Sequence, residues 1–481
     1  MLRNRMTRRR LLGCAAMAGS ALLTQACQPR VVEKIVEKPV TVKETVVVQG
    51  TAQVIEKVIT PTAAPRVAPK GPANLRLSVW PYGPDMNTYL TILQAFDKKN
   101  PDIKVTAEQY MGGYYPKVQA NFAAGNSADI IYTQGWKYQP FAESNVLMAL
   151  DAFIQREGVE NLWPQFESYK QACIWRGHYY MSPTDTGGLC LVYNKDIFDK
   201  KGLAYPTDNW TWDQFKDAAT QLSFREGTNK YFGYMQHQGY DELWLLPMRK
   251  DGLLEWDRIV EPTKALWNQP AIVDALQWFA VDVYQKAISP LPSETAGGAV
   301  SFWAGQVAMS IFGPWYLPHL WGDTATKKGG LNYGAAAVPK GKSGKVETMP
   351  YIHGHLMSKA TQWPDAAFKV MTYVLSDEAQ KIIADGGRMP GQSKIIDEYW
   401  AGLVQKKYNL DNPKAFVTGL REGRFNIIAG AGANAGALTA AGQPLPAAME
   451  AMRNGKPAKE VIPDLNAALQ KTLDEYWKAR N

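Results

Sequence analysis

Aromatic side chains are the first candidates for chemistry in this sequence. The 481 residues include 16 Trp and 23 Tyr, more large amphipathic rings than a core needs, so we expect some of them to face a ligand. A ring at the end of a strand can cover a flat apolar face of a solute, while the alternative for each ring is packing in the core. The candidates are Trp80, Tyr82, Trp136 and Trp315, with Trp244 and Trp303 as weaker ones.

Two other motifs suggest chemistry that their surroundings do not support. His353-Gly354-His355 places two imidazoles on one face of an extended segment, but no Cys or third His lies nearby in the sequence, so we predict no metal site. Residues 425–436 are rich in glycine with the spacing G-x-G-x-x-x-G, but the acid that follows, Glu450, lies in an amphipathic stretch rather than at a strand end. We therefore expect a flexible loop there, and we predict no cofactor and no catalytic residue.

The charge of the chain is concentrated in its first residues. The formal net charge is +8, but residues 1–26 hold five Arg and no acid. Without them, 48 basic side chains stand against 45 acidic ones, a net charge of +3. A nucleic-acid partner is therefore not predicted. Beyond this leader no uninterrupted apolar run reaches the length of a membrane span.

Residues 1–26 are typical of an export signal, with arginines before a mildly apolar stretch. Residues 7–12 resemble a twin-arginine signal, and residues 23–27 resemble the lipobox of a bacterial lipoprotein at all but one position. We therefore predict lipidation of Cys27 and an anchor on the outer face of the cytoplasmic membrane. The alternative, Cys14, has no hydrophobic segment between it and the arginines.

Residues 27–73 differ in composition from the rest of the chain. They alternate Val and Ile with Glu and Lys, continue into a stretch of Pro and Ala, and contain no aromatic residue. Such a sequence cannot build a core, and Pro39 interrupts the register that a coiled coil would need. We predict a disordered, lipid-anchored tether, which as a coil would reach on the order of 35–40 Å.

The body of the chain begins with alternating strand and helix patterns. Residues 75–80 alternate like a strand, residues 87–99 carry apolar residues at helical spacing, and residues 103–105 begin a second strand. Residues 115–124 repeat the helical pattern, and residues 129–132 read as a short buried strand. This order predicts an α/β architecture with binding loops at the carboxyl ends of the strands.

Several motifs follow one another along the body. They are Phe96 to Val105, Lys117 to Ile130, Tyr193 to Phe215, Phe302 to Trp315, Val338 to Gly341 and Asp365 to Gln380. In order and spacing they resemble the extracellular solute-binding proteins of bacterial ABC importers, in the sugar-binding branch that includes maltose-binding protein. Each motif alone is weak, but together they cover nearly everything from Leu75 to Trp477.

This resemblance implies the type II periplasmic-binding-protein fold, or Venus flytrap, in which two discontinuous α/β lobes close on a solute. The implied lobes are 74–184 with 308–353 for lobe 1, and 185–307 with 354–481 for lobe 2. The chain is expected to cross between them near 183–188, 307–311 and 352–356. Gly187, Gly188 and Gly354 in these segments suit hinge motion, because glycine tolerates large changes of φ and ψ.

A sugar presents apolar C–H faces and a rim of hydroxyls, so its site needs flat rings with polar groups at their edges. The resemblance places Trp315, in a Gly-Pro-Trp motif, as a stacking ring. Asp185 could accept hydrogen bonds from sugar hydroxyls, although maltose-binding proteins carry a carboxylate nearer to Gly187. Arg388, which follows two glycines, either reaches the cleft or caps the end of a helix.

The function implied by the resemblance is carbohydrate capture for an ABC importer. The protein would act as a monomer, without enzymatic activity, and would deliver its ligand to permease subunits in the membrane that work with a cytoplasmic ATPase. The alternative is a secreted carbohydrate-active hydrolase, which would also combine aromatic rings with Asp/Glu pairs. Cys173 and Cys190 could form a disulfide or remain buried thiols.

Overall fold

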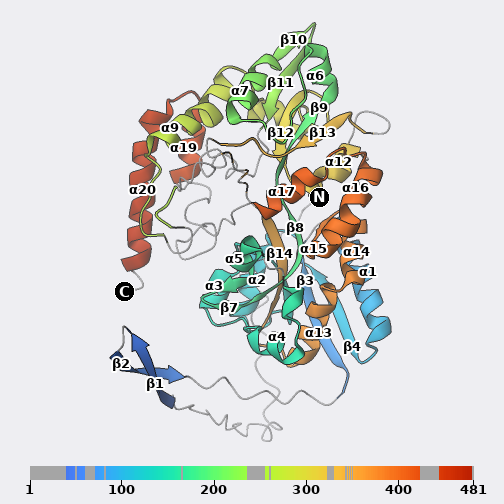
Figure 1. Ribbon diagram of the computed structural model, residues 1–481, viewed down its shortest axis with the longest axis vertical. Helices are drawn as coiled ribbons and strands as arrows, with labels where there is room; N and C mark the ends of the chain where they lie inside the picture. The colour runs from blue at the N-terminus through green and yellow to red at the C-terminus, as the bar shows by residue number, and fades with distance from the viewer. Residues whose placement is uncertain are drawn as a thin grey trace, which may run out of the picture. The chain divides into compact units, whose positions relative to one another are not determined.

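Figure 1 shows the fold of the chain in a computed structural model. The described residues are 40–48, 51–59, 71–80, 83–163, 166–235, 255–258, 262–321, 330–341, 344, 346, 348, 350–422 and 444–478. They belong to two compact units, one within residues 1–67 and the other within residues 68–481. Among these residues, no helix is both long and apolar enough to cross a lipid bilayer.

The first unit contains a β-hairpin. β1 (Val40–Val48) pairs with β2 (Thr51–Ile59) in antiparallel register over the whole of both strands. The sequence analysis predicts a disordered tether over 27–73, and the structure differs from it at these strands. Val, Thr and Ile are branched at Cβ and favour the extended chain, and the two runs are separated by two residues, the spacing of a tight hairpin. The leader and Cys27 lie outside the described residues.

The described part of the second unit forms two large sheets and a short hairpin of β6 (Ile174–Trp175) with β7 (His178–Tyr179). The strands of the first sheet are β3 (Ala73–Val79), β4 (Ile103–Gln109), β5 (Ile130–Gln134), β8 (Met181–Gly187), β14 (Tyr351–Met357) and β15 (Met389–Pro390). They lie in the order β15-β8-β14-β5-β3-β4. β3 is parallel to β4 and β5, whereas β14 is antiparallel to β5 and β8.

The second sheet has five strands in the order β10-β11-β12-β9-β13. They are β9 (Cys190–Asn194), β10 (Phe224–Glu226), β11 (Asn229–Met235), β12 (Val307–Phe312) and β13 (Tyr333–Ala336). β11 is parallel to β12, and β9 is antiparallel to both of its neighbours. Every residue of β9 and β12, in the middle of the sheet, and of the edge strand β13 is buried, so both faces of these strands are covered.

Helices cover both sheets (Figure 1). Those before β9 are α1 (Gly83–Lys99), α2 (Tyr114–Ala123), α3 (Gln139–Glu143), α4 (Asp151–Glu157), η1 (Glu160–Leu162) and α5 (Glu167–Cys173). Those between β9 and β13 are α6 (Lys195–Lys201), α7 (Trp212–Gln221), α9 (Pro270–Leu276), η3 (Gln277–Asp282), α10 (Val283–Gln285), α11 (Pro292–Thr295), η4 (Ala296–Gly298), η5 (Pro314–Tyr316) and α12 (Leu317–Trp321). Those after β14 are α13 (Pro364–Val374), α14 (Asp377–Asp385), α15 (Ser393–Ile395), η6 (Ile396–Trp400), α16 (Ala401–Tyr408), α17 (Lys414–Arg421), α19 (Pro444–Arg453) and α20 (Ala458–Lys478).

The strand and helix pattern predicted at the start of the body is confirmed. β3, α1, β4, α2 and β5 follow one another in that order. α1 ends at Lys99 because Pro101 disfavours the helical conformation at the residue before it. There Asn100 turns its side-chain amide back to donate to the carbonyl oxygen of Phe96, at 3.0 Å. The helix therefore ends here, and β4 begins a few residues later.

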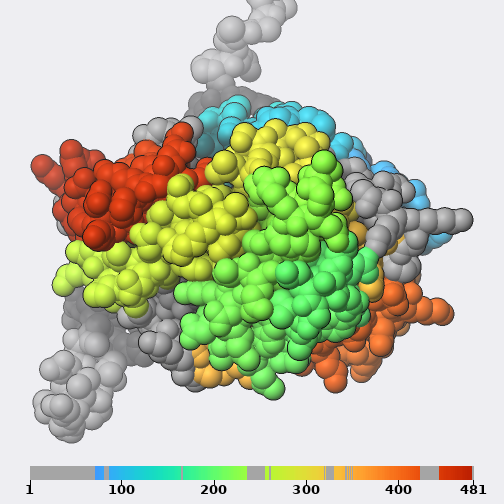
Figure 2. Space-filling model, turned by 90° about the horizontal axis from the view of Figure 1, so that it is seen from above, coloured from blue at the N-terminus to red at the C-terminus, as the bar shows by residue number. Residues whose placement is uncertain are grey.

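The strand pairings correct the predicted lobe boundaries. The sequence assigns 308–353 to lobe 1, but β12 and β13 pair with β9 in the second sheet. It assigns 354–481 to lobe 2, but β14 belongs to the first sheet, and α13 and α14 pack beside it. A fully buried strand is apolar in either sheet, so hydrophobicity does not reveal its partners. At the end of that range α19 packs against η3, and α20 packs against α9 and η3, as Figures 1 and 2 show, while α17 also contacts β9.

Two of the three crossings between the sheets also differ from those expected from the sequence. The chain passes from β8 to β9 at Gly187-Gly188, where a crossing was expected. The crossing expected at 307–311 is not there, because β12 lies wholly in the second sheet. The one expected at 352–356 comes earlier, between β13 and β14.

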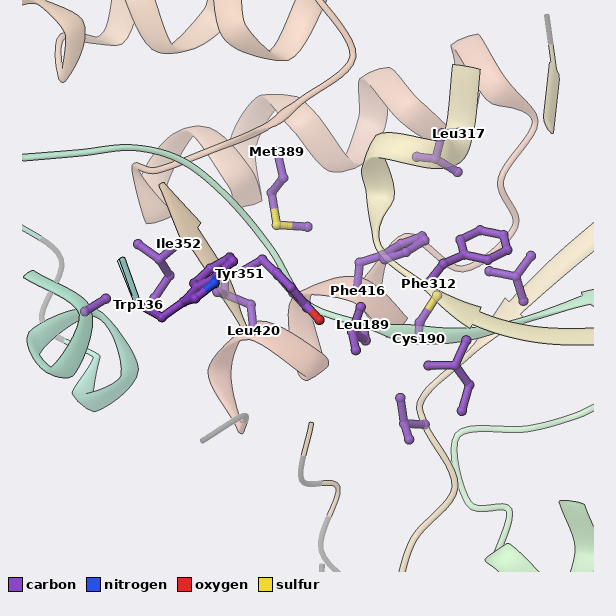
Figure 3. Close-up of a cluster of buried hydrophobic side chains, with 14 of the residues drawn as sticks. Trp136, Leu189, Cys190, Phe312, Leu317, Tyr351, Ile352, Met389, Phe416 and Leu420 are labelled. Carbon is purple, nitrogen blue, oxygen red and sulfur yellow. The ribbon is translucent and has the colours of Figure 1, made fainter. Parts of the chain in front are cut away.

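Helix α17 packs directly on the crossing from β8 to β9. A Cβ atom on Gly188 would lie 2.1 Å from the carbonyl oxygen of Phe416, and one on Gly419 would lie 2.3 Å from that of Leu189. The backbones touch because neither glycine has a side chain. Figure 3 shows Phe416 of α17 beside Leu189 in the buried cluster around this crossing.

The two body cysteines are both buried and unpaired. Cys173 lies at the end of α5 and Cys190 at the start of β9. Of the two alternatives in the sequence analysis, the structure therefore has the buried thiols. Burial raises the pKa of both thiols, which keeps them protonated and unreactive.

Candidate functional site

Three predicted site residues from distant parts of the chain meet in one pocket. Trp80 follows β3, Asp185 lies in β8, and Arg388 follows α14. The described residues that line the pocket are Trp80, Thr88, Tyr89, Ile92, Tyr132, Asp185, Ile383 and Arg388. Rings and hydroxyls thus surround one carboxylate and one guanidinium.

Asp185 is buried and held by partners from three elements. Its Oδ2 accepts a hydrogen bond from His353 Nδ1 at 2.9 Å and lies 3.3 Å from Arg388 Nη1, while its Oδ1 accepts one from the Thr184 hydroxyl at 2.9 Å. Burial alone would raise the pKa of Asp185, but the interactions with His353 and Arg388 outweigh it and lower the pKa to about 2. The group is therefore a carboxylate at neutral pH.

The local structure brings these groups together. His353 of β14 lies directly opposite Asp185 of β8, and the register shifts at the next residue. Arg388 arrives through two glycines: Gly387 has a φ of +93°, and a Cβ on Gly386 would lie 2.4 Å from the Thr88 hydroxyl. Because only glycine fits this approach of α14 to α1, the sequence Gly-Gly-Arg delivers the guanidinium to the pocket rather than to the end of the helix.

His355, two residues along the same strand, lies in a different environment. It is fully buried, its ring contacts those of Tyr89 and Tyr132, and no described residue forms a hydrogen bond with either ring nitrogen. Burial lowers the pKa of His355 to about 4, so the ring is neutral at pH 7. Within the described residues, no three His, Cys, Asp or Glu side chains are placed to hold a metal ion.

A row of aromatic rings runs from the first sheet toward the second. Trp136 contacts Tyr351 edge-on with ring centroids 5.2 Å apart, and Tyr351 contacts Trp315 at 5.1 Å. Trp315 is followed by Tyr316, whose ring is stacked on that of Trp303 at 5.9 Å. We call these five residues the ring row. Three of the six predicted rings belong to it.

The ring row and the pocket are continuous. The ring of Trp136 lies 5.8 Å from that of His353, which in turn binds Asp185. Trp136 itself is buried, with 6% of its surface exposed. Its ring therefore packs against neighbouring side chains and offers little surface to a ligand. Trp315 is half-buried and lies over Gly187 and Gly313, where Cβ atoms would come within 2.6 and 2.1 Å of its ring.

Other predicted residues are placed as follows. Trp80 is half-buried and packs against Tyr114 and Tyr115 with centroid distances of 5.2 and 6.0 Å. Tyr82 and Trp244 lie outside the described residues. Five members of the site were not predicted, because in the sequence they resemble ordinary core residues. They are Thr88, Tyr89, Tyr132, Tyr316 and Tyr351. The sequence analysis considered His353 only as a metal ligand and rejected that role.

This arrangement of two α/β sheets joined by crossing strands, with polar and aromatic groups at the crossing, defines a class of ligand-binding proteins. Residues 80–381 match the bacterial extracellular solute-binding proteins, and the chain belongs to that family. An uncharacterised ABC transporter extracellular-binding protein of Pyrococcus horikoshii is 22% identical over 337 residues, which cover 68% of this chain and 74% of the relative.

Solved structures agree on the fold. The ABC substrate-binding protein of Listeria monocytogenes in complex with cycloalternan has a TM-score of 0.70 and 21% identity, over 84% of this chain and 99% of that one. The cyclic α-maltosyl-1,6-maltose binding protein of Arthrobacter globiformis has a TM-score of 0.67 and 16% identity, over 84% and 100%. The predicted type II periplasmic-binding-protein fold is thereby confirmed.

The general function predicted from the sequence is also confirmed. The protein is an exported solute-binding component of an ABC transporter. Members of this family bind solutes for transport and do not catalyse reactions on them, so family membership gives no support to the alternative of a secreted hydrolase.

Proposed function

We propose that the solute is a carbohydrate, captured at the crossing between the two sheets and delivered to the permease subunits of an importer. The half-buried Trp315 ring carries this proposal, because it stands at the crossing and is continuous through the ring row with a polar pocket. A ring face beside hydroxyl, carboxylate and guanidinium groups matches the C–H face and hydroxyl rim of a sugar. A maltotriose-binding protein of Pyrococcus abyssi, 20% identical over 322 residues, supports the same ligand class.

Each named candidate has a place in this proposal. Trp315 stacks on the sugar, and Trp80 extends the apolar surface beside the pocket, while Tyr82 stays a candidate from the sequence alone. Arg388 and Asp185 supply polar contacts at the edge. Trp136 and Trp303 support these groups from the ring row, and Trp244 stays a candidate from the sequence alone.

Isothermal titration calorimetry with glucose, galactose, mannose, maltotriose and maltotetraose tests the proposal. We expect saturable binding of at least one of these sugars, without cleavage of the oligosaccharides. Small-angle scattering at saturation should then show a more compact particle, because the lobes close on the ligand. Failure of the whole panel to bind, in protein whose folding is verified by circular dichroism, would contradict the proposal.

We also propose that the mature protein is a monomer held to the membrane through a lipid on Cys27. The support is the arginine-rich leader and the lipobox-like sequence that ends at this residue. Replacing Cys27→Ser should release the protein from the membrane fraction and abolish labelling by a palmitate analogue. The matched control is Cys14→Ser, which should leave both unchanged; the opposite pattern would move the anchor to Cys14.

A further inference from the structure

The side chain of Asp185 faces the pocket because β8 contains one residue more than the paired part of β14. Ser182 lies opposite His355, and Asp185 lies opposite His353. The two histidines are two residues apart, whereas Ser182 and Asp185 are three apart and in a regular strand would point to opposite faces. Thr184 is the extra residue, and the β-bulge that it forms turns Asp185 toward His353.

A buried amide on α14 binds this bulge. Gln380, in the first turn of the helix, is fully buried. Its Nε2 donates to the carbonyl oxygens of Thr184 and Val374, at 3.0 and 2.8 Å. Its Oε1 accepts from the backbone N–H of Gln392 at 3.0 Å, and the backbone N–H of Gly391 donates to the same Thr184 oxygen at 3.1 Å. The bulge is thereby tied to α14 and to the segment after β15.

The amide of Gln380 is satisfied in one orientation only. Its two N–H groups meet two carbonyl oxygens, and its oxygen meets an N–H group, so a side chain turned over would bring oxygen against oxygen. An apolar side chain at this position would deprive buried backbone groups of a hydrogen-bond partner, which weakens the hold on the bulge. The same helix leads through Gly386 and Gly387 to Arg388.

We propose that Gln380 is a positioning residue of the solute site, which fixes the bulge at Thr184 and thereby the place of the Asp185 carboxylate. Gln380 is not among the described residues that line the pocket, so we expect it to act on the solute through Asp185. In what it says of solute affinity, this inference rests on the proposed function. The position of Asp185, however, can be tested without any solute.

Nuclear magnetic resonance of the ligand-free protein gives the first test. His353 Nδ1 lies 2.9 Å from Asp185 Oδ2, and because Asp185 is a carboxylate, the imidazole donates this hydrogen bond. The chain has five histidines, so isotope-labelled histidine gives few signals, and His353→Gln identifies the one from this Nδ1–H. Gln380→Met keeps the length of the side chain and removes the amide, so it should shift or abolish the signal. An unchanged signal in the folded variant overturns the inference.

The matched control is Gln470→Met in α20. Gln470 also donates to one backbone carbonyl, that of Thr263, and accepts from one backbone N–H, that of Ala265, at 3.0 and 2.9 Å. Its loss removes the same kinds of hydrogen bond on a helix that packs against α9 and η3. The signal of His353 should therefore stay as it is in the wild type.

Calorimetry with each panel sugar that binds gives the second test. Gln380→Met should weaken binding about tenfold, and Gln470→Met should leave it unchanged. If Gln380 has a purely structural role, both variants lose stability to urea while the His353 signal and the affinity stay unchanged, which overturns the inference. If no sugar binds to the wild type, the proposed function fails, and the His353 signal still decides whether Gln380 positions Asp185.

Hydrogen exchange in the wild type does not depend on the folding of any variant. The backbone N–H of Gln392 donates to Gln380, and that of Ala265 donates to Gln470, so the two amides form a matched pair. If solute binding requires the bulge in place, a saturating sugar reduces the opening of the Gln380 contacts. Exchange at Gln392 should then slow by about tenfold relative to exchange at Ala265. An equal effect at both amides overturns the inference and leaves sugar capture intact.

Discussion

The pocket and the ring row adjoin each other, but different interactions hold their side chains in place: charge in the pocket and steric fit in the ring row. In the pocket, Asp185 and Arg388 hold each other through charge, and His353 and Thr184 complete the shell of the carboxylate. In the ring row, the position of Trp315 is set by the absence of side chains at Gly187 and Gly313. We therefore expect the pocket region to respond to pH and charge, and the ring row to respond to shape.

The two histidines of β14 lie in different surroundings. His353 lies at the junction of both regions and is satisfied by Asp185. His355 lies behind the pocket rings, deeply buried and neutral. Alternation along the strand places both rings on the same face, so their different states come from their neighbours and not from the strand itself.

The largest effect expected at the site is a loss of folding stability in acid. The unfolded chain protonates His355 near pH 6.5, whereas the folded chain keeps it neutral down to about pH 4. Protons are therefore bound preferentially by the unfolded state in this window, and stability falls as the pH is lowered through it. Between pH 7 and pH 4 this one group should cost about 3 kcal/mol, measurable by urea unfolding at a series of pH values.

Replacing His355→Leu should remove that part of the pH dependence, because leucine has a similar volume and no proton to bind. The control is His178→Leu, which changes an imidazole that is 61% exposed and should leave the slope as it is in the wild type. If His355→Leu unfolds with the wild-type slope between pH 7 and pH 4, the buried imidazole is not the group that titrates.

The ring row should show its effect in affinity. Covering one face of a sugar with Trp315 removes on the order of 60–100 Å² of apolar surface from water, or about 1.5–2.5 kcal/mol. Trp315→Ala should therefore weaken sugar binding roughly ten- to seventyfold, measured by calorimetry at pH 7. Since the ring is half-buried, unfolding by urea should be affected much less than for a core tryptophan.

Trp400 provides that comparison, because it is completely buried. Trp400→Ala should cost about 3–5 kcal/mol of stability and leave the affinity of the folded fraction unchanged. If Trp315→Ala behaves in the same way, Trp315 is a core residue and the stacking face must be sought at Trp80.

Much of the fold could be predicted from sequence, because local patterns determine it. The strand from Ala73 alternates, and the helix from Gly83 has apolar residues at helical spacing and ends before a proline. Lobe membership could not be predicted in this way. β12 and β14 are both fully buried, and which sheet each one joins depends on pairing with strands that are distant in the sequence.

The site shows the same limit. Trp80, Asp185 and Arg388 could be proposed one by one from residue type and position. Their meeting in one pocket depends on the pairing of β8 with β14 and on the approach of α14 to α1. The partner of Asp185, His353, is 168 residues away in sequence, so no local spacing could have revealed the pair.

The smallest effect expected is a loss of sugar affinity when a single methyl group is added beside the ring row. In Gly187→Ala the added Cβ would lie 2.6 Å from the Trp315 ring, nearer than carbon atoms can approach, and 3.0 Å from the Pro314 side chain, a tight contact. The half-buried ring can move aside, so we expect a loss of sugar affinity of about 1 kcal/mol, roughly fivefold, and not a failure to fold. The matched control is Gly402→Ala in α16, where a Cβ meets nothing within 4 Å and helix propensity should raise stability by up to about 1 kcal/mol. Unchanged affinity in Gly187→Ala, with normal unfolding in both variants, would show that the exact position of the Trp315 ring does not matter for binding.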